Sequence, residues 1–273
     1  MSYATKLRVY PEAEFGGITR FDGPLLYYSR VNALIDCDSI VLDYGCGRGA
    51  HLSKNVRFYK ELCSFRSKAK KVIGVDVEAS GGVNPTLDEF RPLENGSIPL
   101  DSSSVDLCHS DWVVEHLEDV HEVFEEICRV LKPGGYFCFR TPNRFHYSSF
   151  GAAIVPFSWH HRIRRFLKHF HEQEDVFPTY YRCNTRWAAI RRLREHGFKP
   201  LVQYHRGLSH LNGLGYWPGL LGRWIEAASP LFLCHEIHAF GKKKHLGDAD
   251  LRNPSSVAPS HSVAVDSGGI SSH

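Results

Sequence analysis

A chain of 273 residues can bury a sizeable core, and it fits one domain with an insertion better than two full domains. Its hydrophobic fraction of 42% and charged fraction of 23% are ordinary for a globular protein. A net charge of +3 excludes a strong electrostatic attraction of the whole protein to nucleic acid. The first residues lack the apolar core of a secretory signal and no apolar run reaches the ~18 residues of a membrane span, so we expect a cytoplasmic protein.

The cysteines and histidines are numerous but follow no metal-binding pattern. The eight cysteines include no CxxC pair, and none of the seventeen histidines belongs to an HxxxH or HExxH motif. Several cysteines stand among apolar neighbours. We therefore expect reduced cysteines that pack as small hydrophobic side chains, and no metal site.

The first half of the chain alternates helical and strand patterns. Residues 24–36 carry apolar positions at helical spacing, and residues 39–44 form a short apolar run closed by glycines, as in a buried strand. A helix can follow from residue 50 to about residue 59. Further buried strands are expected at 71–77, which contains an acid near its end, and at 104–110.

The next segment contains an amphipathic helix. Residues 117–131 place apolar side chains at spacings of three and four, and Pro133-Gly134-Gly135 ends the helix before a strand at 136–140. Strands that are apolar throughout and alternate with helices favour a parallel sheet covered on both faces. The sequence therefore predicts an α/β fold.

The chain changes character after Asn143. Residues 144–185 are rich in histidine, arginine and aromatic residues, a helix is expected at 185–196, and a late strand is expected at 231–240. Residues 246–273 turn to Ser, Gly, Pro and Asp, which is typical of a disordered tail.

A glycine loop follows the strand at 39–44. Gly45, Gly47 and Gly49 stand at alternate positions, and glycines permit positive φ and a close approach of backbone N–H groups to a ligand. The loop alone leaves alternatives open. It fits a plain turn, and with Ala50 it also fits the dinucleotide pattern GxGxxG/A.

Two acids accompany this loop. Asp43 ends the strand before it and can bind a ligand ammonium directly or through water. Asp76 ends the next strand, and its carboxylate suits a ribose diol because it can accept two hydroxyl hydrogen bonds.

Five segments, in order over residues 39–143, resemble the motifs of the class I S-adenosylmethionine-dependent methyltransferases. They are Val41–Gly49, Val72–Asp76, Ile98–Asp106, Ser110–Asp119 and Arg129–Gly135. The resemblance is to the small-molecule branch, the ubiquinone/menaquinone-methyltransferase-like group (methyltransferase type 11). It implies a Rossmann-like sandwich with a mostly parallel seven-stranded sheet, an antiparallel last hairpin, an inserted helical cap, and S-adenosylmethionine as cofactor.

The resemblance also divides the chain. The methyltransferase domain is expected to span residues 1–245, followed by the tail at 246–273. Within the domain we expect a cofactor-binding half at 24–143, a cap and substrate region at 144–224, and the last strand within 225–245.

Cofactor contacts follow from the resemblance residue by residue. Asp43 and the glycine-loop backbone would hold the methionyl part, Asp76 would take the ribose hydroxyls, and Val77 would pack on the adenine. Later residues would form hydrogen bonds with the adenine amino group and surround the sulfonium. The expected set is Asp43, Gly45, Cys46, Gly47, Gly49, Asp76 and Val77, then Glu94 or Asn95 at the amino group, and Ser110, Asp111 and Trp112 near the sulfonium.

Methyl transfer from a sulfonium is an in-line displacement that depends mainly on holding the nucleophile at near-attack distance. A base is needed only for a hydroxyl or a carbon acid, and His116, expected one turn into the helix after the strand at 104–110, is the catalytic candidate. Alternatively, Glu115 and His116 only begin that helix. We expect a small-molecule acceptor, with oxygen favoured over nitrogen or carbon. The rival functions are a nicotinamide-dependent oxidoreductase and a non-catalytic scaffold that binds the cofactor.

The segment 144–224 is locally basic, with thirteen Lys and Arg against four Asp and Glu, and aromatic residues are interspersed. One interpretation is a lid for an anionic or aromatic acceptor. Another is contact with a membrane surface or a lipid-like acceptor, because residues 159–170 alternate basic and apolar side chains. A nucleic-acid groove uses the same residue types but is disfavoured, and a solvated cap with its own aromatic core is the plain alternative.

Overall fold

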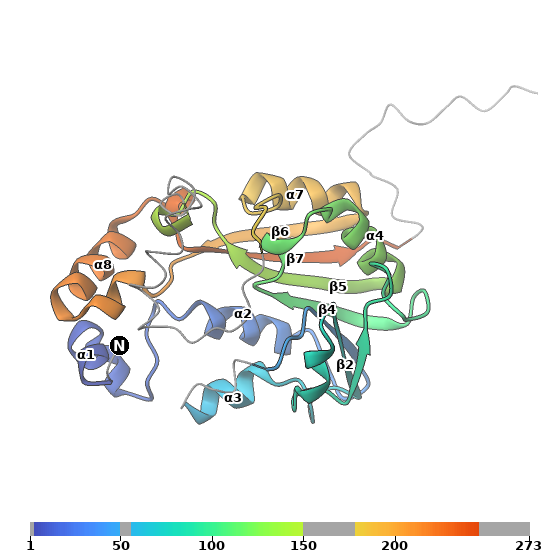
Figure 1. The fold of residues 1–273 in the computed structure, drawn as a ribbon, viewed down its shortest axis with the longest axis horizontal. Helices are drawn as coiled ribbons and strands as arrows, with labels where there is room; N and C mark the ends of the chain where they lie inside the picture. The colour runs from blue at the N-terminus through green and yellow to red at the C-terminus, as the bar shows by residue number, and fades with distance from the viewer. Residues whose placement is uncertain (1–2, 50–55, 150–177, 246–273) are drawn as a thin grey trace, which may run out of the picture.

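A seven-stranded sheet forms the centre of the computed structural model, which describes residues 3–49, 56–149 and 178–245 (Figure 1). The strand order is β3-β2-β1-β4-β5-β7-β6. The first five of these run parallel, and β7 is antiparallel to both of its neighbours. The strands are β1 Ile40–Tyr44, β2 Lys71–Asp76, β3 Glu89–Pro92, β4 Val105–Asp111, β5 Leu131–Pro142, β6 Phe198–His205 and β7 Glu236–Lys243. The expected mostly parallel sheet is confirmed.

Helices cover both faces of this sheet. Helices α4 and α7 lie over one face, and α2 and α3 lie over the other (Figure 1). The α-helices are α1 Tyr3–Val9, α2 Gly23–Asn32, α3 Arg57–Cys63, α4 Val120–Val130, α7 Arg186–Glu195 and α8 Tyr216–Ala228. Short 3₁₀ helices are η1 Pro11–Glu14, η3 Ala79–Val83, η4 Val114–His116, η6 His210–Leu214 and η7 Leu231–Leu233. The architecture is the α/β sandwich that the sequence predicts.

Apolar side chains fill the space between the sheet and each helical layer. Under α4 and α7, Phe124 packs edge to face on Phe137 with ring centroids 5.0 Å apart, and Leu193 is buried in the same cluster. Under α2, Tyr27 and Val41 belong to a second buried cluster. Because both faces are covered, the central strands are apolar on both sides, which explains their unbroken apolar runs.

Several predicted boundaries were wrong. Pro133-Gly134-Gly135, expected to end the helix before a strand at 136–140, lies inside β5, and the helix expected at 24–36 ends at Asn32. The amphipathic helix begins at Val120 rather than at residue 117, because the Asp119 carboxylate accepts hydrogen bonds from the backbone N–H groups of His121 and Glu122 and caps it there. The last strand begins at Glu236 rather than at residue 231, because the apolar run before it forms the short helix η7.

The prediction missed strand β6, which lies inside the segment 144–224 assigned to the cap. This strand is at the edge of the sheet and carries Lys199, Pro200 and Gln203, so its alternation of apolar and polar side chains is weak. Helix α7 and β6 therefore belong to the sandwich rather than to a cap. Residues 150–177, which include the expected interfacial stretch 159–170, lie outside the described residues, as does the predicted tail.

Helix α3 overlaps the helix predicted at 50–59 but begins at Arg57, and residues 50–55 of that prediction are outside the described residues. At one end of the molecule α1 packs on α8 (Figure 1). Arg223 donates to the Val9 carbonyl oxygen at 2.7 Å across this contact. Among the described helices, none is both long and apolar enough to cross a membrane.

Candidate functional site

The carboxyl ends of β1, β2 and β4 meet at one edge of the sheet because these strands are parallel neighbours. The loop after Tyr44, the Asp76 carboxylate and the turn after Asp111 therefore come together, although they are far apart in sequence. Ligands of open α/β sheets bind outside this end of the strands. The predicted site residues thus converge at the edge where a ligand is expected.

Hydrogen bonds donated by backbone N–H groups hold the glycine loop in place. Gly45 N–H donates to the Val75 carbonyl oxygen at 2.8 Å, and Gly47 N–H donates to Asp76 Oδ2 at 2.9 Å. Gly45 has φ +74°, and a Cβ there would lie 2.4 Å from a methyl carbon of Val113. Glycine is therefore required at this position both for its conformation and for the space it leaves.

Asn84, which the sequence prediction overlooked, supports the same loop from η3. Its side-chain amide donates to the carbonyl oxygens of Cys46 at 2.9 Å and Gly47 at 3.2 Å, and its Oδ1 accepts from Thr86. A Cβ on Gly49 would lie 2.7 Å from Asn84 Oδ1. The signal available in the sequence was an asparagine two residues after the glycine pair Gly81-Gly82.

Asp43 lies at the end of β1 in a buried position beside two other acids. Burial, followed by the charges of Asp111 and Asp76, raises the pKa of Asp43 to about 7. A histidine lies near this carboxyl group, with His109 Nε2 3.9 Å from Asp43 Oδ1. A cationic ligand group beside Asp43 would relieve this electrostatic cost.

Asp76 and the end of β3 form the next part of the edge. The Asp76 backbone carbonyl accepts from Leu93 N–H at 2.9 Å, which places the turn at Glu94 and Asn95 beside β2. Val77 is 72% exposed, so it offers an apolar surface at the rim. The predicted ribose and adenine residues are therefore neighbours in the fold.

The turn after β4 carries Asp111 and Trp112. Arg140 binds Asp111 through two hydrogen bonds, Nε to Oδ1 at 2.7 Å and Nη2 to Oδ2 at 2.9 Å, and Tyr28 donates to Oδ2 at 2.9 Å. Burial would raise the pKa of Asp111, but the Arg140 charge and these hydrogen bonds lower it. Trp112 has φ +59° and is partly exposed, and Ser110 Oγ is buried without a hydrogen bond among the described residues.

Comparison with known proteins identifies this arrangement. Residues 42–139 match the family model described as "Methyltransferase domain". A Mycolicibacterium smegmatis protein described as an S-adenosylmethionine-dependent methyltransferase is 35% identical over 115 residues, which span 40% of each chain. The malonyl-[acyl-carrier protein] O-methyltransferase of Yersinia pestis is 29% identical over 198 residues, 69% of this chain and 68% of the relative.

Residues 42–139 are therefore similar to the methyltransferase domain of the class I S-adenosylmethionine-dependent methyltransferases, and the chain spans under half the length of the Mycolicibacterium relative. The cofactor of this family is S-adenosylmethionine. The comparisons therefore favour S-adenosylmethionine over the nicotinamide cofactor of the alternative oxidoreductase. Two solved structures support the fold at TM-score 0.50. One is the Haloferax volcanii complex of the Trm112 activator with a proposed methyltransferase (15% identity, 89% of this chain and 95% of that one), and the other is a proposed sarcosine dimethylglycine methyltransferase of Galdieria sulphuraria (16%, 81% and 85%).

The environment of His116 differs from the prediction. His116 ends the 3₁₀ helix η4 and precedes α4, so it does not lie one turn into the long helix. Its Nδ1 lies 2.9 Å from the Pro178 carbonyl oxygen, and because a carbonyl only accepts, Nδ1 carries the proton. The neighbouring Glu115 is buried, which raises its pKa to about 7, and its backbone carbonyl accepts from Tyr180 N–H. The pair therefore ties the segment after residue 177 to the end of β4.

A chain of buried polar groups continues past Asp111, and the sequence prediction missed it. Arg140 Nη1 donates to Glu236 Oε2 at 3.1 Å, and His238 lies 2.8 Å from Glu236 Oε1. Tyr27 bonds His109 Nδ1 at 2.8 Å on the other side of Asp111. The signal in the sequence was Arg140 itself, a charged residue at the end of an otherwise apolar strand.

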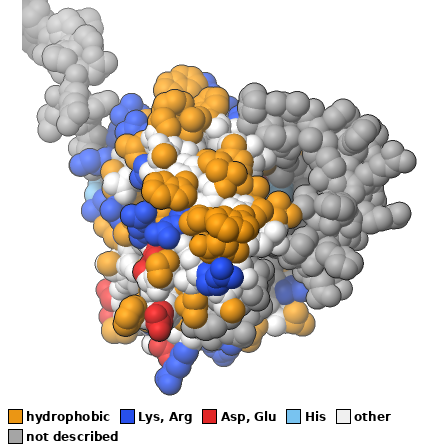
Figure 2. Space-filling model, turned by 90° about the vertical axis from the view of Figure 1, so that its left-hand side faces the viewer, with side chains coloured by type: hydrophobic (Ala, Val, Ile, Leu, Met, Phe, Trp, Pro, Cys, Tyr) orange, Lys and Arg blue, Asp and Glu red, His pale blue; other side chains and the backbone are white. Residues whose placement is uncertain are grey.

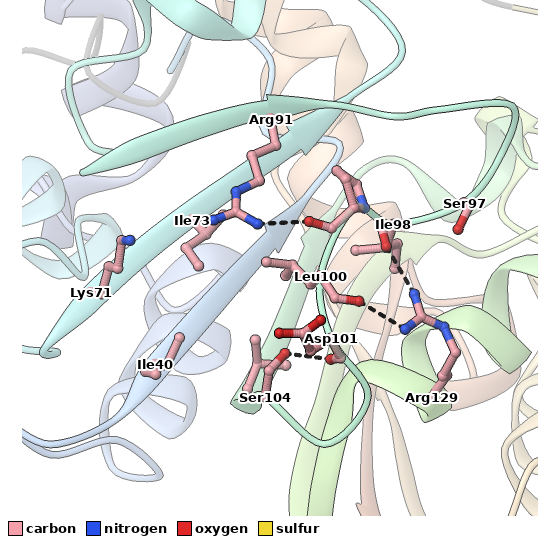
Figure 3. A pocket seen from close by; sticks show the side chains of 12 residues that line it. Ile40, Lys71, Ile73, Arg91, Ser97, Ile98, Leu100, Asp101, Ser104 and Arg129 are labelled. Carbon is pink, nitrogen blue, oxygen red and sulfur yellow. Dashed lines mark hydrogen bonds between the residues drawn. The ribbon is translucent and has the colours of Figure 1, made fainter.

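A hollow of about 560 Å³ lies elsewhere, near the amino ends of the strands (Figure 3). Ile40 and Lys71, the first residues of β1 and β2, line it with the segment 97–101. Arg91 and Arg129 fix that segment by donating to its carbonyl oxygens. This hollow is at the opposite end of the strands from the glycine loop, so it is not the expected cofactor site.

Proposed function

We propose that the protein transfers the methyl group of S-adenosylmethionine to an oxygen atom of a small or carrier-bound acceptor. The convergence of the glycine loop, Asp76 and Trp112 at the carboxyl edge of the sheet carries the proposal. Relatives of 27–29% identity whose names give a malonyl-[acyl-carrier protein] acceptor support oxygen. A non-catalytic scaffold would bind the cofactor but release no methylated product.

The cofactor residues keep the roles that the family implies. Asp43 pairs with the ammonium of the methionyl part, and Gly45, Cys46, Gly47 and Gly49 offer the loop backbone. The buried, acid-rich surroundings of Asp43 support this role, because a cation there lowers the cost of a charged carboxylate.

Asp76 binds the ribose hydroxyls in this proposal. It accepts from two backbone N–H groups, those of Gly47 and Glu78, and these bonds orient a carboxylate that retains further acceptor capacity. Val77 packs on the adenine, and Glu94 or Asn95 reads its amino group.

Ser110, Asp111 and Trp112 surround the sulfonium end. The buried Ser110 hydroxyl without a hydrogen bond among the described residues is available to the cofactor. The Asp111 carboxylate is already bound by Arg140 and Tyr28, so we assign it a positioning role that fixes the turn at Trp112.

The acceptor we favour is a carboxylate. A carboxylate is already deprotonated at neutral pH, so its methylation needs alignment with the sulfonium rather than a base. A hydroxyl acceptor would need a base, and His116 then accepts its proton at Nε2, because the Pro178 carbonyl holds the proton on Nδ1.

The experiment that tests the acceptor uses S-adenosylmethionine with a tritiated methyl group and the malonyl thioester of an acyl carrier protein. A carboxyl methyl ester releases labelled methanol in mild alkali, whereas a methyl ether keeps its label. We expect alkali-labile label, and His116→Asn should change kcat only a few-fold. Alkali-stable label on a hydroxyl acceptor, with kcat lowered about 10²–10⁴-fold by His116→Asn, would contradict the carboxylate proposal.

A lipid-like acceptor, or contact with a membrane surface, is supported by the outer face of α8. Trp217, Leu221 and Trp224 recur at helical spacing and are 75%, 59% and 67% exposed. Figure 2 shows this end of the molecule, where hydrophobic side chains gather with Lys and Arg among them. Exposed tryptophans on a helix with basic neighbours are typical of helices that lie in the lipid interface.

A further inference from the structure

The β6–β7 ladder brings together three side chains that can bind a metal ion. His205 is the register partner of Glu236, and His238 follows Glu236 by two residues, on the same face of β7. One ligand atom from each residue lies within 4.8 Å of the other two. The sequence analysis predicted no metal site, because these residues follow no short motif and meet only through strand pairing.

Glu236 is the centre of this cluster. His238 Nε2 lies 2.8 Å from Glu236 Oε1, and His205 Nδ1 lies 3.9 Å from the same oxygen. The two imidazole rings stack with centroids 5.0 Å apart and an interplanar angle of 6°. Both imidazoles therefore present nitrogen to one carboxylate oxygen.

The position of Glu236 is fixed by its neighbours. Gly23, the first residue of α2, lies against Oε1, and a Cβ there would come within 1.6 Å of that oxygen. On the other oxygen, Oε2 accepts from Arg140 at 3.1 Å, and His235 Nδ1 lies 3.6 Å away. Such orientation of a ligating carboxylate by surrounding groups is a usual feature of protein metal sites.

The local charge favours a cation. Asp111 and Glu236 share one guanidinium, that of Arg140; Arg140 and Glu236 are buried, and Asp111 is partly buried. If the histidines are neutral, two negative charges face one positive charge. An additional cation beside Glu236 would balance them, as is usual for buried charges.

The cluster borders a cavity through one of its residues. His205 is half-buried and lines a cavity of about 280 Å³ together with Tyr204, Arg206 and Leu231. Its Nδ1 is buried and has no hydrogen bond among the described residues, so this nitrogen is available to a ligand.

We propose that His205, Glu236 and His238 bind a divalent transition-metal ion of the zinc class. Two imidazole nitrogens and one carboxylate oxygen are ligands that Zn²⁺ and Co²⁺ accept, with a fourth position left for water. The proposal does not depend on the methyl acceptor or on the cofactor assignment.

The test is calorimetric titration of the metal-free full chain with Zn²⁺, followed by the visible absorption spectrum of the Co²⁺ complex. We expect one site per chain and the spectrum of four-coordinate Co²⁺. His205→Ala, at the end of an edge strand, and Glu236→Gln should each raise Kd for Zn²⁺ by more than about tenfold.

His121→Ala is the matched control, because His121 pairs with His196 on the α4–α7 side of the molecule and offers only two ligands. The site should survive this change. Two results would overturn the proposal. One is no Zn²⁺ binding by the wild-type chain, and the other is an unchanged Kd in both His205→Ala and His238→Gln while each variant still melts cooperatively.

Discussion

The Asp43 carboxyl group is held at the end of β1 in surroundings that disfavour its charge. Burial and the neighbouring acids Asp111 and Asp76 raise its pKa to about 7. Its charge state in the free protein therefore changes near neutral pH. A ligand that requires the ionised carboxylate binds only the fraction of the protein in which Asp43 is deprotonated.

The affinity for S-adenosylhomocysteine should therefore depend on pH through Asp43. In the proposed site the ammonium of S-adenosylhomocysteine pairs with the ionised Asp43 carboxyl, so protonation of Asp43 competes with binding. Between about pH 6 and pH 8 the affinity should rise by up to about tenfold and then level off above the pKa. Calorimetry across this range measures the effect. In Asp43→Asn the affinity should be lower and the pH dependence lost; a profile identical to the wild type would contradict the assignment.

At the scale of elements, the loop and η3 act as one unit through Asn84. Removal of its side chain in Asn84→Ala leaves the carbonyl oxygens of Cys46 and Gly47 without these donors. We expect a loss of about 1–3 kcal/mol in the free energy of unfolding, together with weaker S-adenosylhomocysteine binding. Chemical denaturation and calorimetry measure the two effects.

Thr86→Val is the control for this prediction, since it removes one hydroxyl bond to Asn84 and leaves the bonds to the loop intact. Its affinity for S-adenosylhomocysteine should stay within about twofold of the wild type. Equal losses of affinity in the two variants would mean that Asn84 acts through general stability and not through the loop.

Helix α8 gives a second prediction at this scale. Trp217→Ser with Trp224→Ser should abolish sedimentation of the protein with vesicles of phosphatidylcholine and phosphatidylglycerol, because interfacial tryptophans are removed. Trp187→Ser is the matched control, since Trp187 on α7 is similarly exposed. Wild-type protein that does not sediment with these vesicles would contradict membrane contact.

Elements with strong patterns were predictable from the sequence, and those set by tertiary contacts were not. The buried strands β1, β2 and β4 and the glycine loop followed from continuous apolar runs that end in glycine or acid. Strand β6 was missed because an edge strand with Lys199 and Pro200 needs neither a continuous nor a clean alternating pattern.

The candidate site divides in the same way. Gly45 and Asp76 could be found because a local motif carries them. The contacts of Asp111 with Arg140, and of Glu236 with His205, join residues from different strands, and no local spacing encodes such pairs. His116 was found by type and position, but the short helix that holds it depends on the contact with Pro178.

At the scale of the whole molecule, Arg140 joins the carboxyl end of β4 to the beginning of β7. Its guanidinium binds Asp111 on one side and Glu236 on the other. Burial alone would raise the pKa of both acids, but Arg140 and nearby hydrogen bonds lower both. Since lowered folded-state pKa values stabilise the fold above the unfolded pKa near 4, this contribution is present at neutral pH and is lost as pH falls.

Arg140→Met should therefore destabilise the protein by about 3–5 kcal/mol at pH 7.5, because two buried carboxylates lose their partner. Without Arg140 the pKa of each acid should rise, so the deficit relative to wild type should shrink at pH 5.5. Urea denaturation at both pH values measures this. Arg57→Met, which removes an exposed pair with Glu61, should leave the free energy of unfolding nearly unchanged at either pH. A deficit that does not change with pH would refute the account.

The central claim is that the carboxyl edge around the glycine loop and Asp76 binds S-adenosylmethionine. Calorimetric titration with S-adenosylhomocysteine tests it most directly, with NAD as the competing ligand and Asp101→Ala, an exposed acid, as control. We expect one S-adenosylhomocysteine per chain, no NAD binding, and an affinity about 10–100-fold lower in Asp76→Ala but unchanged in Asp101→Ala. Unchanged affinity in a folded Asp76→Ala, or binding of NAD in place of S-adenosylhomocysteine, would contradict the account.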